Sequence, residues 1–207
     1  MVGLLTVVIV GLLSAGVAGA VVHRHGGPGA SKTPAGFQRV VDTNDHISVA
    51  VPAGWQEKVL SAEALAAQVR DLAAAEPQLA ALSSLTSVRV RNPQLGLYTK
   101  DPSTQIQMLT IGFDAPGIHS VSDIPVAEVT GPLQSAGASH IATTPVHLPV
   151  GQAEQVTNQL TIETATVTES LVYFLRRGRA VELMVVAPGA DPPTSLLRQI
   201  EATVSPA

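Results

Sequence analysis

Three strand-like segments follow one another in the last third of the sequence, and they constrain the fold more than any other feature. They are Gln152–Ile162, Thr166–Leu175 and Ala180–Ala187, three successive predicted strands. The last two are joined by Arg176-Arg177-Gly178-Arg179, a link short enough for a tight hairpin, with Gly178 supplying a positive φ. The pattern predicts an antiparallel meander. In its middle strand the side chains facing one way are Leu171, Tyr173 and Leu175, and those facing the other way are Val172 and Phe174.

Earlier segments add further strands to this meander. Ile47–Val51 alternates with a period of two, and Arg39–Asp42 precedes it across a turn of Asn and Asp. Gly96–Thr99 and Ile106–Phe113 are predicted to be neighbouring strands. Ile141–Leu148 is extended, and its prolines favour an edge position. We expect Trp55, the only tryptophan, to fill the core.

Apolar side chains at spacings of three and four predict helices between these strands and after them. One helix begins near Ser61, and Pro77 separates it from a second, shorter one. A third is capped by Ser122 or Asp123 and runs towards Ser135. The apolar stripes are Leu65, Val69 and Leu72; Leu79, Leu82 and Leu85; and, in a closing helix from Ser195 to Val204, Leu196, Leu197, Ile200 and Val204. The predicted class is α+β, an antiparallel β-sheet flanked by helices in an α/β/α sandwich.

The amino-terminal segment has a different character, because residues 1–22 are apolar without one charged side chain. A helix of that length spans about 33 Å, enough to cross a hydrocarbon core of about 30 Å. It is either a transmembrane anchor or a signal peptide, for which Ala18-Gly19-Ala20 is a suitable cleavage site. Residues 23–37 are rich in Gly, Pro and Ala and predict a flexible linker, so that 38–207 form a single domain. We therefore expect the domain to face outward from the cell membrane or to be secreted.

Cysteine content and charge exclude several classes of protein. The chain has no cysteine, which excludes a disulfide framework, a thiolate zinc site, a catalytic thiol and a lipidated cysteine after the apolar run. The 16 acidic side chains all lie in the domain together with ten of the 12 basic ones, and aromatic residues make up 3% of the chain. Nucleic-acid binding needs a basic surface and, for single strands, stacking aromatics, so this class is excluded.

Residues of catalytic type are present without a catalytic motif. Asp42, Asp45 and His46 suggest acid–base chemistry, but we favour a polar hairpin turn, because Asp side chains commonly bond the backbone of turns. His119, His140 and His147 are dispersed and His23 and His25 lie in the linker, so no metal site or cofactor is predicted. No hydrolase elbow, phosphate-binding loop or dinucleotide motif occurs. We therefore expect a protein that is not an enzyme.

The best candidate for binding is the cluster of Arg176, Arg177 and Arg179 at one hairpin turn of an acidic domain. Guanidinium groups bind carboxylates, phosphates or lipid headgroups through paired hydrogen bonds. The alternative is a solvated turn whose charges keep the protein soluble.

The segment Ile47-Ser48-Val49-Ala50-Val51-Pro52-Ala53-Gly54-Trp55 resembles the opening of Mog1/PsbP-like domains, in which a strand is followed by Pro, a small residue, Gly and Trp. Gly151-Gln152-Ala153, the turn at Arg177-Gly178-Arg179 and the closing helix resemble their ends. Within that group, the chain is similar to the actinobacterial exported family typified by the lipoprotein LpqN. The resemblance implies export and an antiparallel sheet between helices, and it transfers no catalytic residue. The acylated cysteine of the lipoprotein members is missing here.

Three functions follow from these expectations. The leading one is an exported or membrane-tethered, non-enzymatic accessory or interaction domain of the bacterial cell envelope, whose partner is another protein or an envelope component. The alternative is a carrier of a lipid or other hydrophobic ligand, since 45% of the residues are hydrophobic. A hydrolase with a convergent active site is the third, because such sites need only geometry.

Overall fold

Strands dominate the part of the chain that the computed structural model describes, which comprises residues 32–43, 45–60, 67, 70, 74, 95–99, 107–114, 117–162, 165–191 and 193–207. The strands are β1 (Phe37–Asp42), β2 (Ile47–Pro52), β3 (Gln56–Leu60), β4 (Leu95–Thr99), β5 (Gln107–Asp114), β6 (Ser139–Leu148), β7 (Gly151–Ile162), β8 (Ala165–Arg176), β9 (Arg179–Pro188) and β10 (Ser205–Pro206). The helices are the 3₁₀ turn η4 (Val121–Asp123), α3 (Val126–Ser135) and α4 (Thr194–Glu201).

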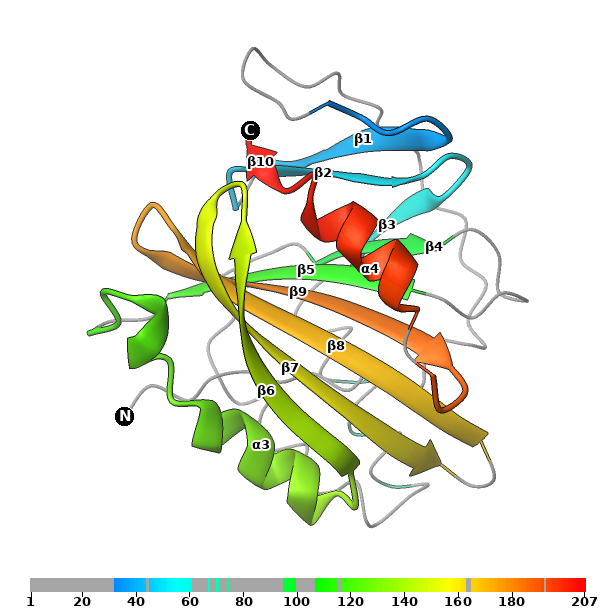
Figure 1. The fold of residues 1–207 in the computed structure, drawn as a ribbon, viewed down its shortest axis with the longest axis vertical. Coiled ribbons are helices and arrows are strands. Elements are labelled where there is room, and N and C mark those ends of the chain that lie inside the picture. Colours follow the sequence, from blue (N-terminus) through cyan, green and yellow to red (C-terminus); the bar gives the residue numbers. More distant parts are fainter. Residues whose placement is uncertain are drawn as a thin grey trace.

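The described strands form two antiparallel sheets (Figure 1). The larger has seven strands in the order β3-β4-β5-β9-β8-β7-β6, and the smaller has three in the order β1-β2-β10. The predicted meander of β7, β8 and β9 is confirmed, as is the pairing of β4 with β5. β6 lies at the edge, as its prolines predicted. The predicted α+β class, with helices beside an antiparallel sheet, is thereby confirmed.

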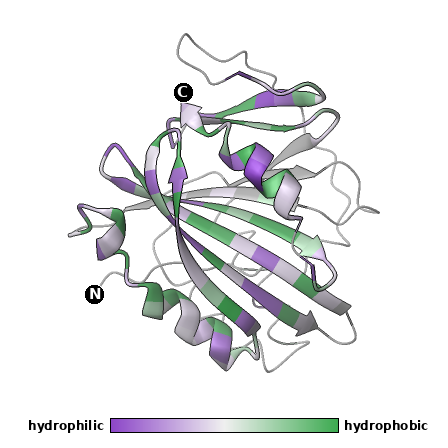
Figure 2. Cartoon of the chain, viewed as in Figure 1, coloured by the Kyte–Doolittle hydropathy of each residue, from purple (hydrophilic) through white to green (hydrophobic). Residues whose placement is uncertain are grey.

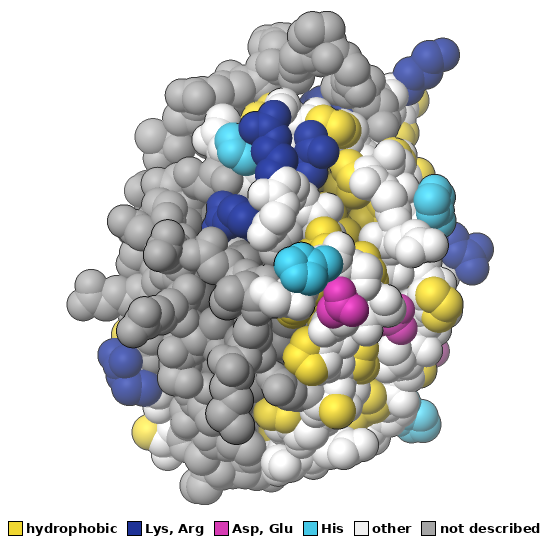
Figure 3. Space-filling model, turned by 90° about the vertical axis from the view of Figure 1, so that its left-hand side faces the viewer, with side chains coloured by type: hydrophobic (Ala, Val, Ile, Leu, Met, Phe, Trp, Pro, Cys, Tyr) yellow, Lys and Arg dark blue, Asp and Glu magenta, His cyan; other side chains and the backbone are white. Residues whose placement is uncertain are grey.

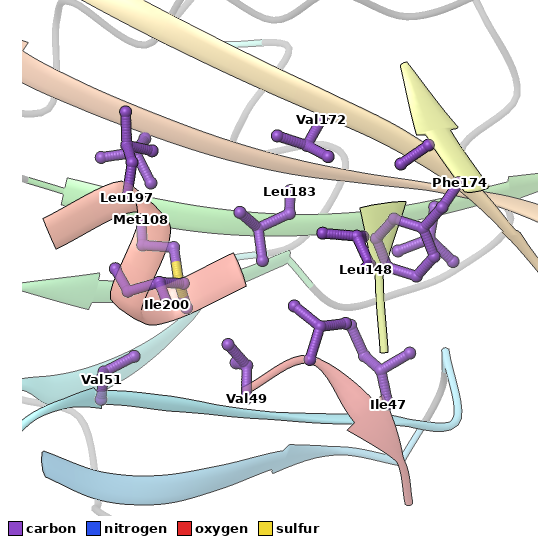
Figure 4. Close-up of a cluster of buried hydrophobic side chains, with 14 of the residues drawn as sticks. Ile47, Val49, Val51, Met108, Leu148, Val172, Phe174, Leu183, Leu197 and Ile200 are labelled. Carbon is purple, nitrogen blue, oxygen red and sulfur yellow. The ribbon is translucent and has the colours of Figure 1, made fainter. Parts of the chain in front are cut away.

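The main core lies between the two sheets, where α4 also packs (Figures 1 and 4). Alternate residues of β8 and β9, among them Val172, Phe174 and Leu183, point to this side. Hydrophobic residues predominate in the middle of both strands (Figure 2). Figure 4 shows side chains of β2, β5, β8, β9 and α4 meeting here. Trp55 belongs to this cluster with 5% of its surface exposed, as expected. The largest fully buried members are Ile47, Met108 and Phe174.

The opposite face of the large sheet carries the other set of alternating side chains. Leu171 and Tyr173 of β8 are fully buried there, as is Leu160 of β7. The turn η4 contacts β7 and β8, and α3 lies beside β6. The predicted division of β8 into two side-chain faces is therefore confirmed.

Some element boundaries differ from the prediction. The third helix reaches Ser135 as expected, but it begins at Val126 after an N-cap at Pro125 rather than at Ser122 or Asp123. The reason is that the Asp123 carboxylate accepts the backbone N–H groups of His119 and Ser120 and so closes the separate turn η4. The short strands β3 and β10 were not predicted.

Other predicted segments lie wholly or mainly outside the described residues. The apolar run 1–22 and most of the linker are among them. So are the two helices expected between Ser61 and Leu85, although the described residues Ala67, Arg70 and Ala74 are helical. Among the described helices, none has the length and apolar character needed to span a membrane.

Candidate functional site

The candidate site is built around the tight turn between β8 and β9. Arg176 pairs with Arg179, which leaves Arg177 and Gly178 as a two-residue loop. Their φ angles are 49° and 74°, the two positive values that define a type I′ turn. The positive φ predicted for Gly178 is confirmed, and Arg177 has the same left-handed backbone. Arg177 is exposed at the tip of this hairpin.

The structure gives the three arginines of the predicted cluster different surroundings. Arg179 is 26% exposed, and its Nη1 lies 2.9 Å from Oδ1 of Asp45 in the β1–β2 turn. Arg176 is half-buried, and its Nε donates to the carbonyl oxygen of His46, 3.4 Å away. Figure 3 shows the side of the molecule that carries the β8–β9 turn, where Lys and Arg side chains gather over one part of the surface. Arg176 and Arg179 thus connect the large sheet to the β1–β2 turn, and Arg177 points to solvent.

Two buried acids lie beneath the arginines, in the turn between β1 and β2. Asp42 and Asp45 are 8% and 3% exposed. Asp42 Oδ1 accepts the backbone N–H of Asp45 at 3.1 Å, which is the turn-stabilising role expected from sequence. Its Oδ2 accepts the Thr110 hydroxyl of β5 at 2.8 Å. The β1–β2 turn is therefore joined to the large sheet through β5 as well as through Arg179.

Asp45 occupies space that only a glycine in β5 leaves open. A Cβ atom placed on Gly112 would lie 1.6 Å from Asp45 Oδ1 and 2.2 Å from its Cγ. Burial, together with the neighbouring Asp42 charge, raises the pKa of Asp45 to about 7, although the Arg179 charge acts in the opposite direction. Protonation of Asp45 therefore falls in the physiological pH range.

A second group of buried polar side chains lies on the opposite face of the large sheet. Glu169 and Glu182 are completely buried and Asn158 is 1% exposed. Asn158 Nδ2 donates to Glu169 Oε2 at 3.1 Å. Burial raises the pKa of Glu169 to about 7 and that of Glu182 well above its usual range.

The histidines do not gather into a site. His119 precedes η4, whereas His140 and His147 lie on β6, and all three side chains are exposed. Within the described part of the chain, no three His, Cys, Asp or Glu side chains lie close enough together to form a metal centre. Acid–base chemistry at Asp42, Asp45 and His46 stays a hypothesis, and the described contacts of the two acids with Thr110, Gly112 and Arg179 join the β1–β2 turn to the large sheet.

Sequence reasoning missed the burial of these acids, although a signal existed for some of them. Glu169 occupies the same alternating positions as Leu171 and Tyr173, and Glu182 stands between Val181 and Leu183 in an apolar strand. A carboxyl at such a position predicts a buried acid. The burial of Asp45 had no local signal, because it depends on Gly112 and Arg179, which are distant in sequence.

Comparison with known proteins gives likenesses in structure alone. No protein-family model matches the sequence. No curated protein matches it either. Among solved structures, a Bacteroides thetaiotaomicron protein is similar with a TM-score of 0.50 and 10% identity, over 82% of this chain and 48% of that one. The chain thus spans about half the length of that protein.

Two further solved structures are similar over most of their length. The Ran-binding protein Mog1p of Saccharomyces cerevisiae has a TM-score of 0.49 and 9% identity, over 81% of this chain and 94% of its own. PA94 of Pseudomonas aeruginosa, a protein of unknown function, has a TM-score of 0.43 and 12% identity, over 83% and 97%. Mog1p belongs to the group that the sequence resembles. Likenesses at this level of identity concern the fold, and they leave ligand and partner open.

Proposed function

We propose that this chain is a non-enzymatic interaction domain of the bacterial cell envelope, either tethered to the membrane or secreted, and that it belongs to the LpqN-like exported group. The apolar run 1–22 supports export or tethering, and the Ile47–Trp55 segment supports the group. In this proposal the exposed Arg177 at the β8–β9 turn binds a carboxylate-rich segment of a protein partner.

The observation that carries this proposal is the backbone of Arg177. Its φ of 49° is a left-handed conformation, which costs a non-glycine residue about 1 kcal/mol or more. Type I′ turns favour Asn, Asp or Gly at this position, and Arg is not among the residues that lower the cost. An exposed side chain in a strained backbone is better explained by what it binds than by what it adds to stability.

The surroundings of Arg177 suit a binding role. The turn is held from below by the Arg179–Asp45 ion pair and by the Arg176 hydrogen bond to His46. A rigid support keeps the guanidinium in place, so less conformational entropy is lost when it binds. The rest of the domain is acidic, which makes this turn the natural place for an acidic partner to dock.

The test is capture of partners from a native envelope extract by the immobilised protein. Arg177→Asn is the appropriate variant, because Asn accepts the left-handed backbone and leaves Arg176 and Arg179 in place. His140→Asn is the matched control, since His140 is also exposed and has a φ of 52°. We expect Arg177→Asn to lose the captured proteins at low salt and His140→Asn to retain them.

Salt and charge distinguish the proposed contact from non-specific retention. Binding through Arg177 should weaken as ionic strength rises, because exposed charges are screened. Arg177→Lys should recover only part of the capture, since Lys lacks the planar pair of donors that a carboxylate accepts. Equal capture by the wild type and Arg177→Asn would reject the proposal.

A further inference from the structure

Two turns from different sheets, the β1–β2 turn and the β8–β9 turn, contact each other (Figure 1). Oδ1 of Asp45 lies 2.9 Å from Nη1 of Arg179. The carbonyl oxygen of His46 accepts a hydrogen bond from Nε of Arg176 at 3.4 Å. Both strands that flank Arg177 are therefore held by the β1–β2 turn.

Burial and a second acid favour the neutral form of Asp45. Its carboxyl fits against β5 because Gly112 has no Cβ atom, and the Gly112 backbone N–H donates to it. Asp42 is buried next to it, and the two carboxyls share a side-chain hydrogen bond, which requires a proton on one of them. Arg179 is close, but Asp45 Oδ1 receives no hydrogen bond of good geometry from any residue that the structure describes. Burial and the Asp42 charge therefore outweigh the Arg179 charge, and the pKa of Asp45 is raised to about 7.

The other titratable and charged groups at this contact come from three elements. His46 belongs to the same turn as Asp45, and imidazole is the side chain that ordinarily changes charge between pH 5 and 8. The three arginines of the β8–β9 turn are permanent positive charges. Asp114, the last residue of β5, is paired with Arg179 in the strand register. An effect of near-neutral pH on this contact must therefore be assigned between Asp45 and His46.

We propose that the β1–β2 turn is a proton-controlled latch for the β8–β9 turn, docked when Asp45 is protonated and loosened when Asp45 is ionised. Ionisation places a second carboxylate beside Asp42 in a buried site, which weakens docking. The docked turn keeps the β8–β9 hairpin rigid, so a partner binds Arg177 more tightly at slightly acidic pH. This regulation rests on the proposed binding role of Arg177, whereas the docking itself does not.

Proton linkage gives the size of the effect. The pKa of Asp45 is raised from 3.8 to about 7 when the turn is docked, so docking takes up a proton between these two pH values. Docking is therefore most favourable below pH 3.8 and weakens as pH rises through 7. Between pH 6 and pH 8 the equilibrium constant for docking falls about tenfold.

The experiment is amide hydrogen exchange of the full chain in detergent at about pH 6 and pH 8, corrected for the intrinsic pH dependence of exchange. The Gly112 amide reports docking, because it donates to the Asp45 carboxyl. Its protection factor should fall about tenfold from pH 6 to pH 8 in the wild type and in His46→Asn, in which Asn accepts the φ of 54°. In Asp45→Asn, which keeps the shape of the neutral acid, it should change less than about twofold. Glu169→Gln is the matched control, since the pKa of Glu169 is also about 7 but its side chain lies on the opposite face of the large sheet, and it should keep the tenfold change.

Partner capture from the envelope extract at the same two pH values tests the regulation. Relative to Asp45→Asn, the wild type should capture more protein at the lower pH than at the higher one. The proposal is overturned if the protection of the Gly112 amide in the wild type is the same at both pH values, or if Asp45→Asn keeps the tenfold change. It is equally overturned if this protection changes as expected while capture by the wild type and by Asp45→Asn responds to pH in the same way. Equal capture by the wild type and Arg177→Asn at both pH values would instead reject the binding role of Arg177, and the change at Gly112 would then stand as docking alone.

Discussion

The replacement of Gly112 by Ala is the most informative perturbation of this fold. The new Cβ atom would lie 1.6 Å from Asp45 Oδ1, 2.2 Å from its Cγ and 2.6 Å from its Oδ2. Heavy atoms settle near 3.5 Å or beyond, so the carboxyl must retreat by about 2 Å. That movement breaks the 2.9 Å ion pair with Arg179 and pushes the β1–β2 turn away from β5.

The expected cost follows from three contributions. Overpacking of a buried site costs about 1–3 kcal/mol. Loss of the Asp45–Arg179 contact adds to it, although Arg179 is 26% exposed and solvent compensates part of the loss. Replacing Gly by Ala within a strand gains about 0.5–1 kcal/mol. The net prediction is that the free energy of unfolding falls by about 2 kcal/mol.

The assay is urea unfolding followed by the fluorescence of Trp55, the only tryptophan, which is buried in the core. Gly131→Ala in α3 is the matched control, because a Cβ there meets nothing within 4 Å. It should stabilise the helix by up to about 1 kcal/mol. Combining Gly112→Ala with Asp45→Ala removes the clashing atoms. The free energy of unfolding should then fall by less than the two single variants predict together, with a difference of at least about 1 kcal/mol.

Additive losses in this cycle would refute the reasoning. If the two single effects sum to the double effect within about 0.5 kcal/mol, Asp45 and Gly112 are not in contact in solution. If Gly112→Ala has the same free energy of unfolding as Gly131→Ala, Asp45 and Gly112 are likewise not in contact in solution.

Three further predictions concern proton binding, the core and maturation. The pKa of Asp45 is raised from 3.8 to about 7 in the fold, so its contribution to stability is present below pH 3.8 and is lost as pH rises through 7. Urea unfolding at several pH values should show a smaller loss in Asp45→Asn than in the wild type, because Glu169, whose pKa is also raised to about 7, still contributes its own loss. Phe174, which is 1% exposed, fills part of the core, and Phe174→Ala should lower the free energy of unfolding by about 3–5 kcal/mol in the same assay. A loss below about 1 kcal/mol would mean that the core is not packed as described. Intact-mass analysis of fractions from the native host should find the full-length chain in the membrane fraction or a chain beginning near Val21 in the medium, and a full-length chain in the cytosol would contradict export.

Local sequence patterns were sufficient for most of the described fold. The three strand-like segments of the last third located β7, β8 and β9, and Gly178 located the tight turn between β8 and β9. The strand β3 was missed because Gln56–Leu60 has mixed polarity and becomes a strand only by pairing with β4, which follows it after more than 30 residues. β10 has two residues and exists through its contact with β2. Pairing between distant segments is not contained in a local pattern.

The candidate site shows the same division. The sequence predicted that Arg176, Arg177 and Arg179 are neighbours on one turn, and the structure confirms this placement at the β8–β9 turn. It did not separate the exposed Arg177 from the two that reach the β1–β2 turn, because their contacts, Asp45 and His46, lie about 130 residues earlier. Binding by this cluster therefore stays a prediction, with Arg177 as the residue on which it is now concentrated.

The most direct test of the account is the unfolding free energy of Arg177→Asn compared with His140→Asn. Both residues have left-handed backbones, with φ of 49° and 52°. If Arg177 is retained for binding at a cost to the fold, Arg177→Asn raises the free energy of unfolding by several tenths of a kcal/mol to about 1 kcal/mol, as His140→Asn does. If Arg177→Asn instead lowers it, Arg177 stabilises the turn itself, and the structural argument for a partner at this site is contradicted.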